Sequence, residues 1–248
     1  MTPIEQNRRF MHCPNFKLKM PESDQSKEIP APPLDKPPMG EFIVLPDFGD
    51  IPYDSYNNLL NIRRSVRTFD DKPMTGAELA FMLWSVQGIQ SLRGPGSFRP
   101  APSGGARHPF ETYIAVKAVD GLNPGIYHYR PTENIGEKTC TIEYIAPHPG
   151  DEVVSNMLAG QIWASKAPIV LFYSCIPYKA EWRYVDMAHR VMLIDLGHAG
   201  QNAMLSAAAL GLGSCCMAAF DQLECDKVLK FDGLDEYTVY AIAVGTPK

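Results

Sequence analysis

The sequence of 248 residues lacks most of the patterns that identify a protein class at first sight. It has no basic run and its formal net charge is -5, so nothing indicates that it binds nucleic acid. Its six cysteines include no C-x-x-C pair, and the polar start MTPIEQNRRFMHC contains no apolar core of a signal peptide. These absences favour a cytoplasmic protein with reduced thiols.

Signatures of common catalytic classes are missing as well. There is no G-x-S-x-G elbow of a hydrolase, and without H-E-x-x-H or a spaced set of cysteines and histidines we predict no metal site. The segment GLGSCC follows a predicted helix instead of a strand, which excludes the dinucleotide-binding fingerprint. Residues 196–220 carry no charge, but their polar residues and the GLGS interruption predict a buried helix and a buried strand, and no membrane span.

Proline is concentrated at one end of the chain. Residues 1–53 contain ten of the 22 prolines, and proline fixes φ and removes a hydrogen-bond donor. We expect this segment to be an extended arm, either disordered or wrapped over the globule or a partner subunit, with a possible edge strand at FIVLP. Residues 54–248 are predicted to form one domain, in which the mixed order of helices and strands favours the α+β class.

Hydrophobic spacing predicts the elements of this domain. Thr75 and Glu78 form the T-x-x-E capping box of one helix. The segment 184–211 is apolar on nearly every side and is predicted to be a buried helix, whose small residues allow close packing, also across a dimer. The loop 91–109 is rich in glycine and proline. Helices are expected at 53–65, 74–89, 151–167, 184–211 and 221–231, and strands at 111–119, 125–131, 140–146, 168–175, 213–220 and 236–245.

Two segments carry residues suited to binding an anion. NIRRSVRTFD places Arg63, Arg64, Ser65 and Arg67 at a helix end, where forked guanidinium donors suit a phosphate. A solvated charged face is the alternative for this cluster. In PSGGARHPF, residues 102–110, the glycines allow close backbone approach to a flat or anionic ligand, although a tight surface loop would also use them.

Other polar residues are expected to be structural. His198 lies on an apolar helix and is expected to be a hydrogen-bonded core residue. Cys215 and Cys216 are adjacent and would point to opposite faces of a strand, so they are expected to be small core residues.

Five segments resemble, in the same order, the nitroreductase family of FMN flavoproteins. The resemblance runs from about Tyr56 to the end of the chain. Within the family the chain is most similar to stand-alone members of the SagB-type dehydrogenase branch, whose peptide-modifying members oxidise azolines to azoles. The proline-rich arm also resembles the leader of such members. The five segments are RRSVRTFD, PSGGARHPFETYIAV, PGIYHYRP, LIDLGHAGQNAMLSAAALGLGSCCMAAFDQ and AVGTP.

This resemblance implies a nitroreductase-like α+β fold, with a central mixed or antiparallel sheet flanked by helices. It implies a homodimer with a long buried helix in its interface and two FMN sites there. Arg63, Arg64 and Ser65 would hold the phosphate and ribityl end, and Arg67 would lie at the pyrimidine edge of the ring. The remaining FMN-binding residues implied are, from the other subunit, Pro102, Ser103, Gly104, Gly105 and Arg107, and around the ring Gln161, Met217, Ala218 and Ala219.

The resemblance also implies two catalytic residues and an activity. Arg183 and Tyr184 stand where the azoline-oxidising members carry a Lys-Tyr pair. Tyrosine can transfer a proton, but arginine stays charged and cannot act as a general base, and Tyr184 could equally be an aromatic wall of the pocket. We expect hydride transfer from NADH or NADPH through FMN to a small organic acceptor such as a nitroaromatic or a quinone. The alternatives are an azoline-to-azole dehydrogenase acting on a partner peptide, and a flavin-binding protein without turnover.

Overall fold

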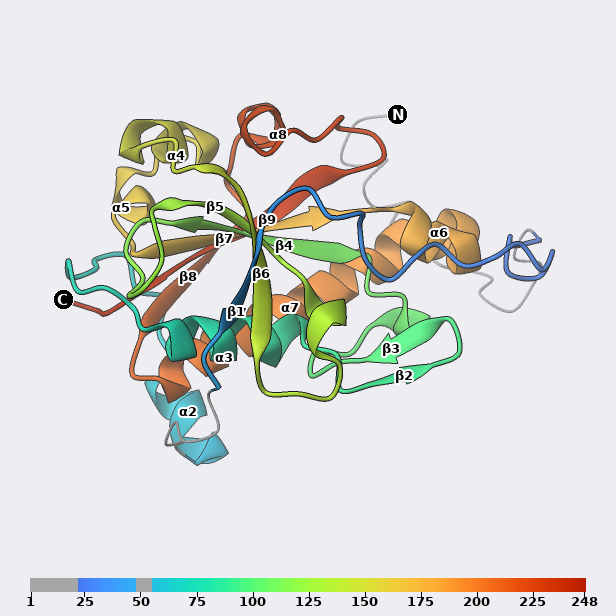
Figure 1. Ribbon diagram of the computed structural model, residues 1–248, viewed down its shortest axis with the longest axis horizontal. Coiled ribbons are helices and arrows are strands. Elements are labelled where there is room, and N and C mark those ends of the chain that lie inside the picture. Colours follow the sequence, from blue (N-terminus) through green and yellow to red (C-terminus); the bar gives the residue numbers. More distant parts are fainter. Residues whose placement is uncertain (1–21, 48–54) are drawn as a thin grey trace, which may run out of the picture.

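The computed structural model describes residues 22–47 and 55–248, and a seven-stranded sheet forms its centre (Figure 1). The strand order is β1-β6-β5-β4-β7-β9-β8, and every neighbouring pair is antiparallel, which confirms the predicted α+β class. The strands of the sheet are β1 (Phe42–Leu45), β4 (Phe110–Val116), β5 (Gly125–Tyr129), β6 (Cys140–Pro147), β7 (Ile169–Cys175), β8 (Gly213–Met217) and β9 (Tyr237–Gly245).

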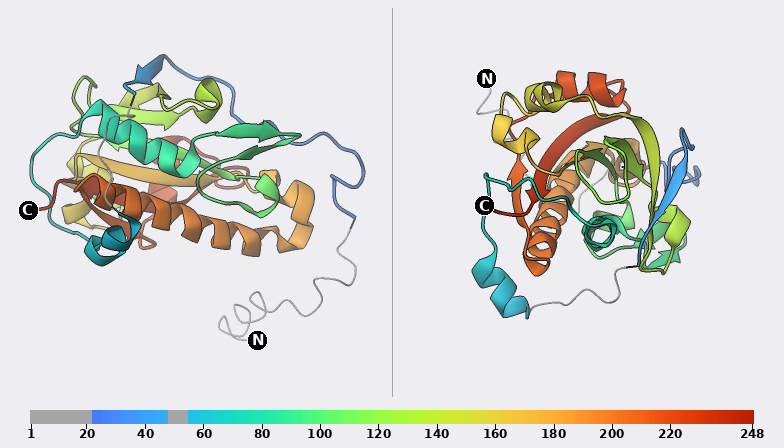
Figure 2. Two further views of the ribbon diagram at one scale, coloured as in Figure 1. Left: turned by 90° about the horizontal axis from the view of Figure 1, so that it is seen from below. Right: turned by 60° about the vertical axis from the view of Figure 1, so that its left-hand side comes forward.

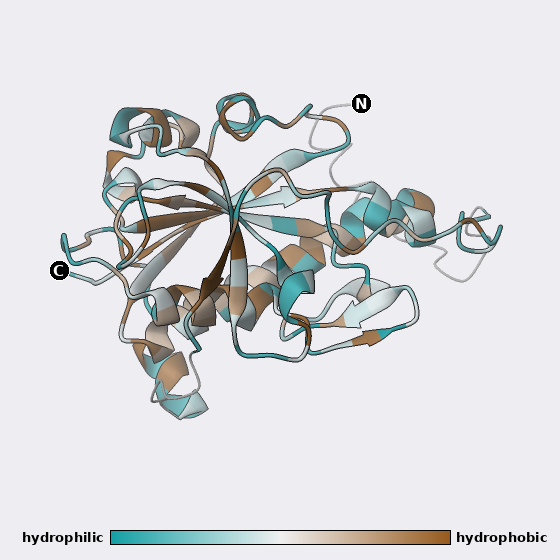
Figure 3. Cartoon of the chain, in the orientation of Figure 1, coloured by the Kyte–Doolittle hydropathy of each residue, from teal (hydrophilic) through white to brown (hydrophobic). Residues whose placement is uncertain are grey.

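Both faces of the sheet are covered by helices. Along β4, Ile114 and Val116 point into one apolar cluster, while Tyr113 and Ala115 point into the other. The first cluster lies under α3 and α7, and the second lies under α4, α5 and α8, so the central strands are apolar on both sides (Figure 3). The helices are α2 (Tyr56–Ile62), α3 (Gly76–Gln87), α4 (Asp151–Met157), α5 (Ile162–Ser165), α6 (Tyr178–Tyr184), α7 (Ala188–Ala209) and α8 (Gln222–Leu229).

Local signals set the starts of two helices. The capping box of α3 is confirmed, because Glu78 N donates to Thr75 Oγ1 at 3.2 Å and Thr75 N donates to Glu78 Oε2 at 2.7 Å. Helix α2 begins after Ser55, whose hydroxyl accepts from Asn58 N. None of the residues of α2 is buried.

The long helix differs from its prediction in one respect. Helix α7 buries Ala199, Ala203 and Ala207 in the first cluster, as expected of small residues at a close contact. Its opposite side is exposed, including Leu193 at 58% and Ile194 at 53%. His198 lies on this exposed side, so its predicted place in the core is wrong. The helix packs against the rest of the protomer along one stripe only, which hydropathy alone did not indicate.

Two further segments differ from the sequence prediction. The expected loop 91–109 contains a hairpin, β2 (Ser91–Arg93) and β3 (Gly96–Phe98), whose turn uses Gly94 at φ 53°. The expected helix 151–167 is split into α4 and α5 because Ala159 and Gly160 both have positive φ.

The described part of the proline-rich arm, residues 22–47, lies against the globule. The arm contacts α6 through two hydrogen bonds. Gln25 N donates to Trp182 O at 3.0 Å, and Trp182 Nε1 donates to Ile29 O at 2.8 Å. Its end is β1, which pairs with β6 at the sheet edge and confirms the strand expected at FIVLP. The rest of the predicted arm, 1–21 and 48–53, lies outside the described residues. Among the described helices, none combines the length and apolarity that a membrane crossing requires.

Candidate functional site

The basic segment after α2 is held against β8. Val66 N donates to Ser214 O at 2.9 Å, and Ser65 pairs with Ser214 in a parallel bridge. Gly213 is necessary at this contact, since a Cβ there would lie 2.7 Å from Val66 Cβ. The segment thereby lines a cavity of about 190 Å³ together with Met204 and Ala208 of α7.

The guanidinium groups of this segment are free to bind an anion. Arg64 Nη1 donates to Arg63 O at 2.8 Å, and the Arg67 guanidinium lies 5.9 Å from the ring centre of Trp163. Within residues 22–47 and 55–248, no ion pair joins Arg63, Arg64 or Arg67 to a carboxylate. Forked cations without a carboxylate partner suit an anion such as a phosphate.

The predicted ring-binding residues lie at the other end of β8. Gln161 Nε2 donates to Leu158 O at 3.0 Å and to Ala219 O at 2.6 Å, which ties the start of α5 to the end of β8. Ala218 and Ala219 are exposed, so small side chains border open space there. Because Arg67 lies against Trp163 of α5, these residues and the basic segment belong to one group. We call it the β8 group: Arg63, Arg64, Ser65, Arg67, Gln161, Met217, Ala218 and Ala219.

The glycine loop is fastened to α7 by a residue that sequence reasoning missed. Asp195 accepts from Ser103 Oγ at 2.7 Å and from Gly104 N at 3.1 Å, and it is only 6% exposed. Burial raises the pKa of its carboxyl, although these two hydrogen bonds oppose the shift. The sequence held one indication of this role. Asp195 is the only acidic residue of a long apolar helix, and a buried carboxylate requires a hydrogen-bond partner.

The same loop touches the predicted catalytic pair. Gly105 has φ 58°, and a Cβ there would lie 2.7 Å from Arg183 Nε and 2.8 Å from the Tyr184 hydroxyl. Any side chain at this position would therefore be strained and would also collide with the pair. The sheet and α7 bring together two segments about eighty residues apart. We call the result the loop group: Pro102, Ser103, Gly104, Gly105, Arg107, Arg183 and Tyr184.

Arg107 and His108 are the buried base of this loop. Arg107 donates from Nε to Gly105 O at 3.0 Å and from Nη2 to Pro95 O at 2.9 Å, and its guanidinium lies 5.0 Å from the ring centre of Trp182. His108 Nε2 donates to Ser97 O at 2.9 Å. Burial, followed by the charge of the Arg99 guanidinium, lowers the pKa of His108 to about 3.

His108 should make the protein sensitive to mild acid. The unfolded chain takes up this proton near pH 6.5 and the folded chain near pH 3, so stability falls as pH decreases through this window. From pH 7 to pH 5 we expect a loss of about 2 kcal/mol in the free energy of unfolding from this residue. Urea unfolding at both pH values measures it, and His108→Gln, which keeps the donor to Ser97 O, should show the smaller loss. Equal losses in both proteins would contradict the assignment.

The loop group and the arginines after α2 contact different halves of α7 in a protomer. Ser103 and Gly104 bind Asp195, whereas Arg63 and Arg64 share a cavity with Ala208. These two α7 residues are thirteen positions apart, which is about 20 Å along a helix. Figure 2 shows this separation, with α2 beside the C-terminal end of α7 and the hairpin β2–β3 near its other half.

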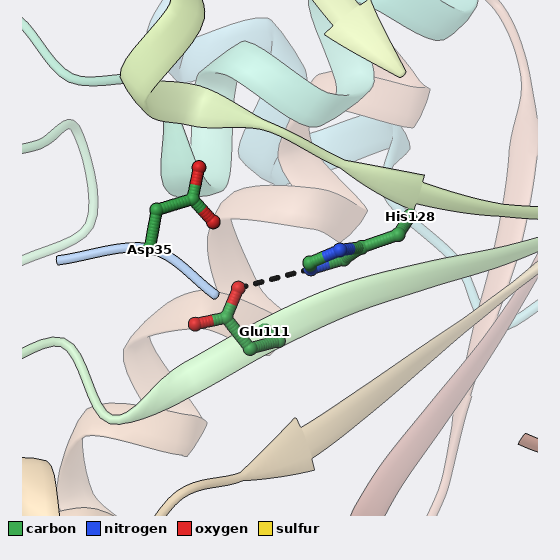
Figure 4. A group of neighbouring side chains, drawn as sticks. All are labelled: Asp35, Glu111 and His128. Atoms are coloured by element: carbon green, nitrogen blue, oxygen red, sulfur yellow. Dashed lines mark hydrogen bonds and ion pairs between the residues drawn. The ribbon is translucent and has the colours of Figure 1, made fainter. Parts of the chain in front are cut away.

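A second buried cluster was not predicted. Glu111 of β4 accepts from His128 Nε2 at 3.0 Å and pairs with Lys179 of α6, and ligand atoms of Asp35, Glu111 and His128 lie within 4.8 Å of one another (Figure 4). Lys179 and the Arg130 guanidinium already engage the two carboxylates. The geometry therefore favours an ion-pair network over a metal site. We call it the arm cluster: Asp35, Lys36, Glu111, His128, Arg130, Glu143, Lys179 and Glu236.

Known proteins are similar to this chain in sequence and in fold. The model described as "Nitroreductase family" matches residues 60–246. The protein named "Putative nitroreductase MJ1384", from Methanocaldococcus jannaschii, is 32% identical over 203 residues, which make up 82% of this chain and 95% of that one. The microcin B17-processing protein McbC of Escherichia coli is 31% identical over 159 residues, 60% of this chain and 54% of that one. A crystal structure of a "putative nitroreductase" from Anabaena variabilis has a TM-score of 0.67 and 25% identity, covering 84% of this chain and 42% of that one.

Proposed function

The chain belongs to the nitroreductase family, and from this premise we propose that it is an FMN-dependent oxidoreductase that transfers a hydride from NADH or NADPH to a small organic acceptor. The family is FMN-dependent and its members are oxidoreductases. The observation that carries the proposal for this chain is the set of three guanidinium groups on one segment, none of which pairs with a carboxylate of the described residues. Two of them, Arg63 and Arg64, supply the fixed positive charge that the phosphate of FMN requires.

The β8 group has a defined task for each part of the cofactor. Arg63, Arg64 and Ser65 bind the phosphate and the ribityl chain. Arg67, braced by the ring of Trp163, supplies positive charge at the pyrimidine edge. Bound FMN supplies reversible hydride uptake at its N5 atom. Gln161 and Ala219 are joined by a hydrogen bond, which orients the backbone after β8 so that an N–H can point at that atom.

We infer that each FMN site is completed by a second copy of the chain. Within one protomer, Arg63 and Arg64 reach α7 at Ala208, whereas the loop group is anchored at Asp195, about 20 Å away along the helix. The exposed stripe of α7, with Leu193 and Ile194, and the uncovered helix α2 offer an apolar surface for a twofold dimer. In such a dimer the loop group of one protomer meets the β8 group of the other.

Tyr184 is the proposed proton donor to the acceptor. Its hydroxyl lies at the bare backbone of Gly105, where a substrate stacked on the flavin would be within reach. We expect Tyr184→Phe to lower kcat with a nitroaromatic acceptor about 100-fold, which is typical for a lost general acid. The rate at which NADH bleaches the flavin should stay within about twofold, because no protein proton is needed for hydride uptake. Stopped-flow absorbance separates the two rates, and unchanged turnover would make Tyr184 only a wall of the pocket.

Azoline oxidation is the second candidate function. It is favoured by the likeness to McbC, which is named as a microcin B17-processing protein, and by the position of Arg183 and Tyr184 against the glycine loop. An azoline-oxidising activity would agree with the proposed place of the chain in the SagB-type dehydrogenase branch. Arginine cannot take the role of a neutral lysine base, so the reductase remains the function that the residues support better.

The deciding experiment is an absorption spectrum of the purified protein, followed by anaerobic NADH and NADPH. Flavin bands that bleach within seconds support the reductase. Bands that persist with both donors would shift the assignment to the azoline dehydrogenase. A colourless protein that does not take up added FMN would overturn both.

The proposed location is the cytoplasm. The five cysteines of the described residues are free thiols, which supports this proposal.

A further inference from the structure

A second, larger cavity opens beside the glycine loop. Its volume is about 630 Å³, within the range of small-molecule sites. The hairpin β2–β3, the loop that follows it and the end of α6 form its walls, and Gln25 of the arm reaches its rim. Four arginines line it: Arg93, Arg99, Arg107 and Arg183.

No acidic residue is among the residues that line this cavity. Arg99 is 8% exposed and donates to neutral acceptors, Ser97 Oγ at 3.0 Å and Gln87 Oε1 at 2.9 Å. Arg107 is 7% exposed and donates only to backbone carbonyls among the hydrogen bonds of the described residues. In the part of the chain that the structure describes, none of the four guanidinium groups has an ion pair with a carboxylate.

The cavity therefore concentrates positive charge. Among the described residues only the charge of Arg99 is partly offset, by the more distant carboxylates of Glu111 and Asp35. The positive charge affects two residues that line the cavity. Burial and the neighbouring Arg183 guanidinium lower the pKa of Arg107. Burial and the Arg99 guanidinium lower the pKa of His108. Holding partly desolvated cations together costs free energy. An anion bound between them would recover that free energy through forked hydrogen bonds.

The phosphate of FMN does not account for this charge. In the proposed function that phosphate lies on Arg63, Arg64 and Ser65, which already provide two guanidinium groups. FMN carries a single phosphate, and the ring end that meets the glycine loop has no comparable anionic group. Arg107 and Arg183 belong to the loop group, but Arg93 and Arg99 have no contact with FMN in the proposed function, so the positive charge of the larger cavity exceeds what the cofactor requires.

We propose that this cavity binds the carboxylate or phosphate group of the small molecule that reacts at the flavin, so that the enzyme acts on an anionic substrate. The proposal rests on the proposed function and adds the chemical class of the reactant. The planar forks of Arg93, Arg99 and Arg107 suit a carboxylate or a phosphate equally. Two sources carry such a group beside the reacting atoms: an anionic acceptor, or the 2′-phosphate of NADPH.

Matched acceptors test the first source. The holoenzyme is assayed with 4-nitrobenzoate and nitrobenzene, and the ratio of their kcat/KM values is compared between the wild type and Arg93→Gln. We expect this ratio to fall at least tenfold in the variant. Lys138→Gln, which removes an exposed cation outside the cavity, should leave the ratio unchanged. The second source is tested in the same two variants by the ratio of flavin-reduction rates with NADPH and NADH.

Binding without turnover separates this proposal from the proposed function. Calorimetric titration of the oxidised holoenzyme with benzoate should give a dissociation constant that Arg93→Gln weakens at least tenfold. Benzoate binding of this kind in a protein that reduces no acceptor would support the anion site and overturn only the reductase. Active reductase whose acceptor ratio, donor ratio and benzoate affinity are all unaffected by Arg93→Gln would overturn the anion site. The anion site would also be overturned if the Arg93→Gln protein lost FMN as readily as Arg63→Ala, because Arg93 would then bind the cofactor.

Discussion

Replacing Arg63 with alanine is expected to weaken FMN binding by 10- to 100-fold. A charge-assisted hydrogen bond contributes roughly 1.5 to 3 kcal/mol, and each 1.4 kcal/mol corresponds to a factor of ten in the dissociation constant. Arg63 lies at the rim of the cavity between α2 and α7, and no carboxylate of the described residues competes for its guanidinium. Titration of the FMN-stripped protein, followed by quenching of flavin fluorescence, gives the constant directly.

Two controls make the Arg63 result specific. Arg63→Lys keeps the charge but loses the fork, so its affinity should lie between those of the wild type and Arg63→Ala. Lys227→Ala removes an exposed cation of α8 that pairs only with Glu224 in the described residues, and it should not change the affinity. If Arg63→Ala folded normally and bound FMN as tightly as the wild type, the phosphate would have to lie elsewhere.

Mixed dimers test the construction of the site from two protomers. Gly105→Val should also weaken FMN binding, because its side chain would collide with Arg183 and Tyr184 and would require a positive φ. If sites form between protomers, unfolding and refolding equal amounts of Arg63→Ala and Gly105→Val together should give about a quarter of all sites wild-type affinity, one site in each mixed dimer. No restored binding, with dimers verified by sedimentation, would mean that each site is built within one protomer.

Lys179→Met is expected to lower the free energy of unfolding by about 3 to 5 kcal/mol, the usual effect of breaking a buried ion pair from one side. Lys179 and Glu111 are 5% and 4% exposed, and Lys179 Nζ also donates to Leu34 O of the arm at 3.1 Å. The methionine can occupy the same space, but the Glu111 carboxylate would stay buried with His128 as its remaining partner. Urea unfolding measures the loss.

The pH dependence distinguishes a lost charge pair from a packing defect. Burial raises the pKa of Glu111, but Lys179 and His128 outweigh burial and hold it below the usual range. The stability that this pair provides is present above the unfolded pKa of about 4.3 and is lost as pH falls through the lower folded value. In Lys179→Met the Glu111 carboxyl is protonated more easily. The difference in the free energy of unfolding between the variant and the wild type should therefore shrink as the pH is lowered from 7 to 4.5.

A double variant completes this test. Lys179→Met combined with Glu111→Gln removes both charges and should recover part of the stability that Lys179→Met alone loses, because no buried charge is left unpaired. A difference between wild type and Lys179→Met that is independent of pH, with no recovery in the double variant, would show that Lys179 matters for packing alone. The result also bears on the site, because Lys179 lies in α6, the helix that carries Arg183 and Tyr184.

Much of the fold follows from the sequence because its signals are local. The continuous apolar run in 168–175, the capping box at Thr75 and Glu78, and the apolar character of 184–211 on nearly every side each depend on residues within a few positions of one another. Short segments in a fixed order were also sufficient to indicate the family. The same reasoning failed where a neighbour distant in sequence decides, as for His198, whose exposure depends on which stripe of α7 meets the sheet.

The sequence by itself determined the class of fold, most of its elements and the residue types that could bind a flavin, because propensity, periodicity and motif order are properties of neighbouring residues. Only the tertiary structure decided which of those residues meet. Sheet register and the length of α7 bring Gly105 to Tyr184, give Ser103 its partner Asp195, and hold Arg63 and Arg64 about 20 Å along α7 from the loop group within a protomer. Burial of Glu111 with Lys179 likewise depends on strands and an arm that pair across the whole chain, and no local pattern records such long-range contacts.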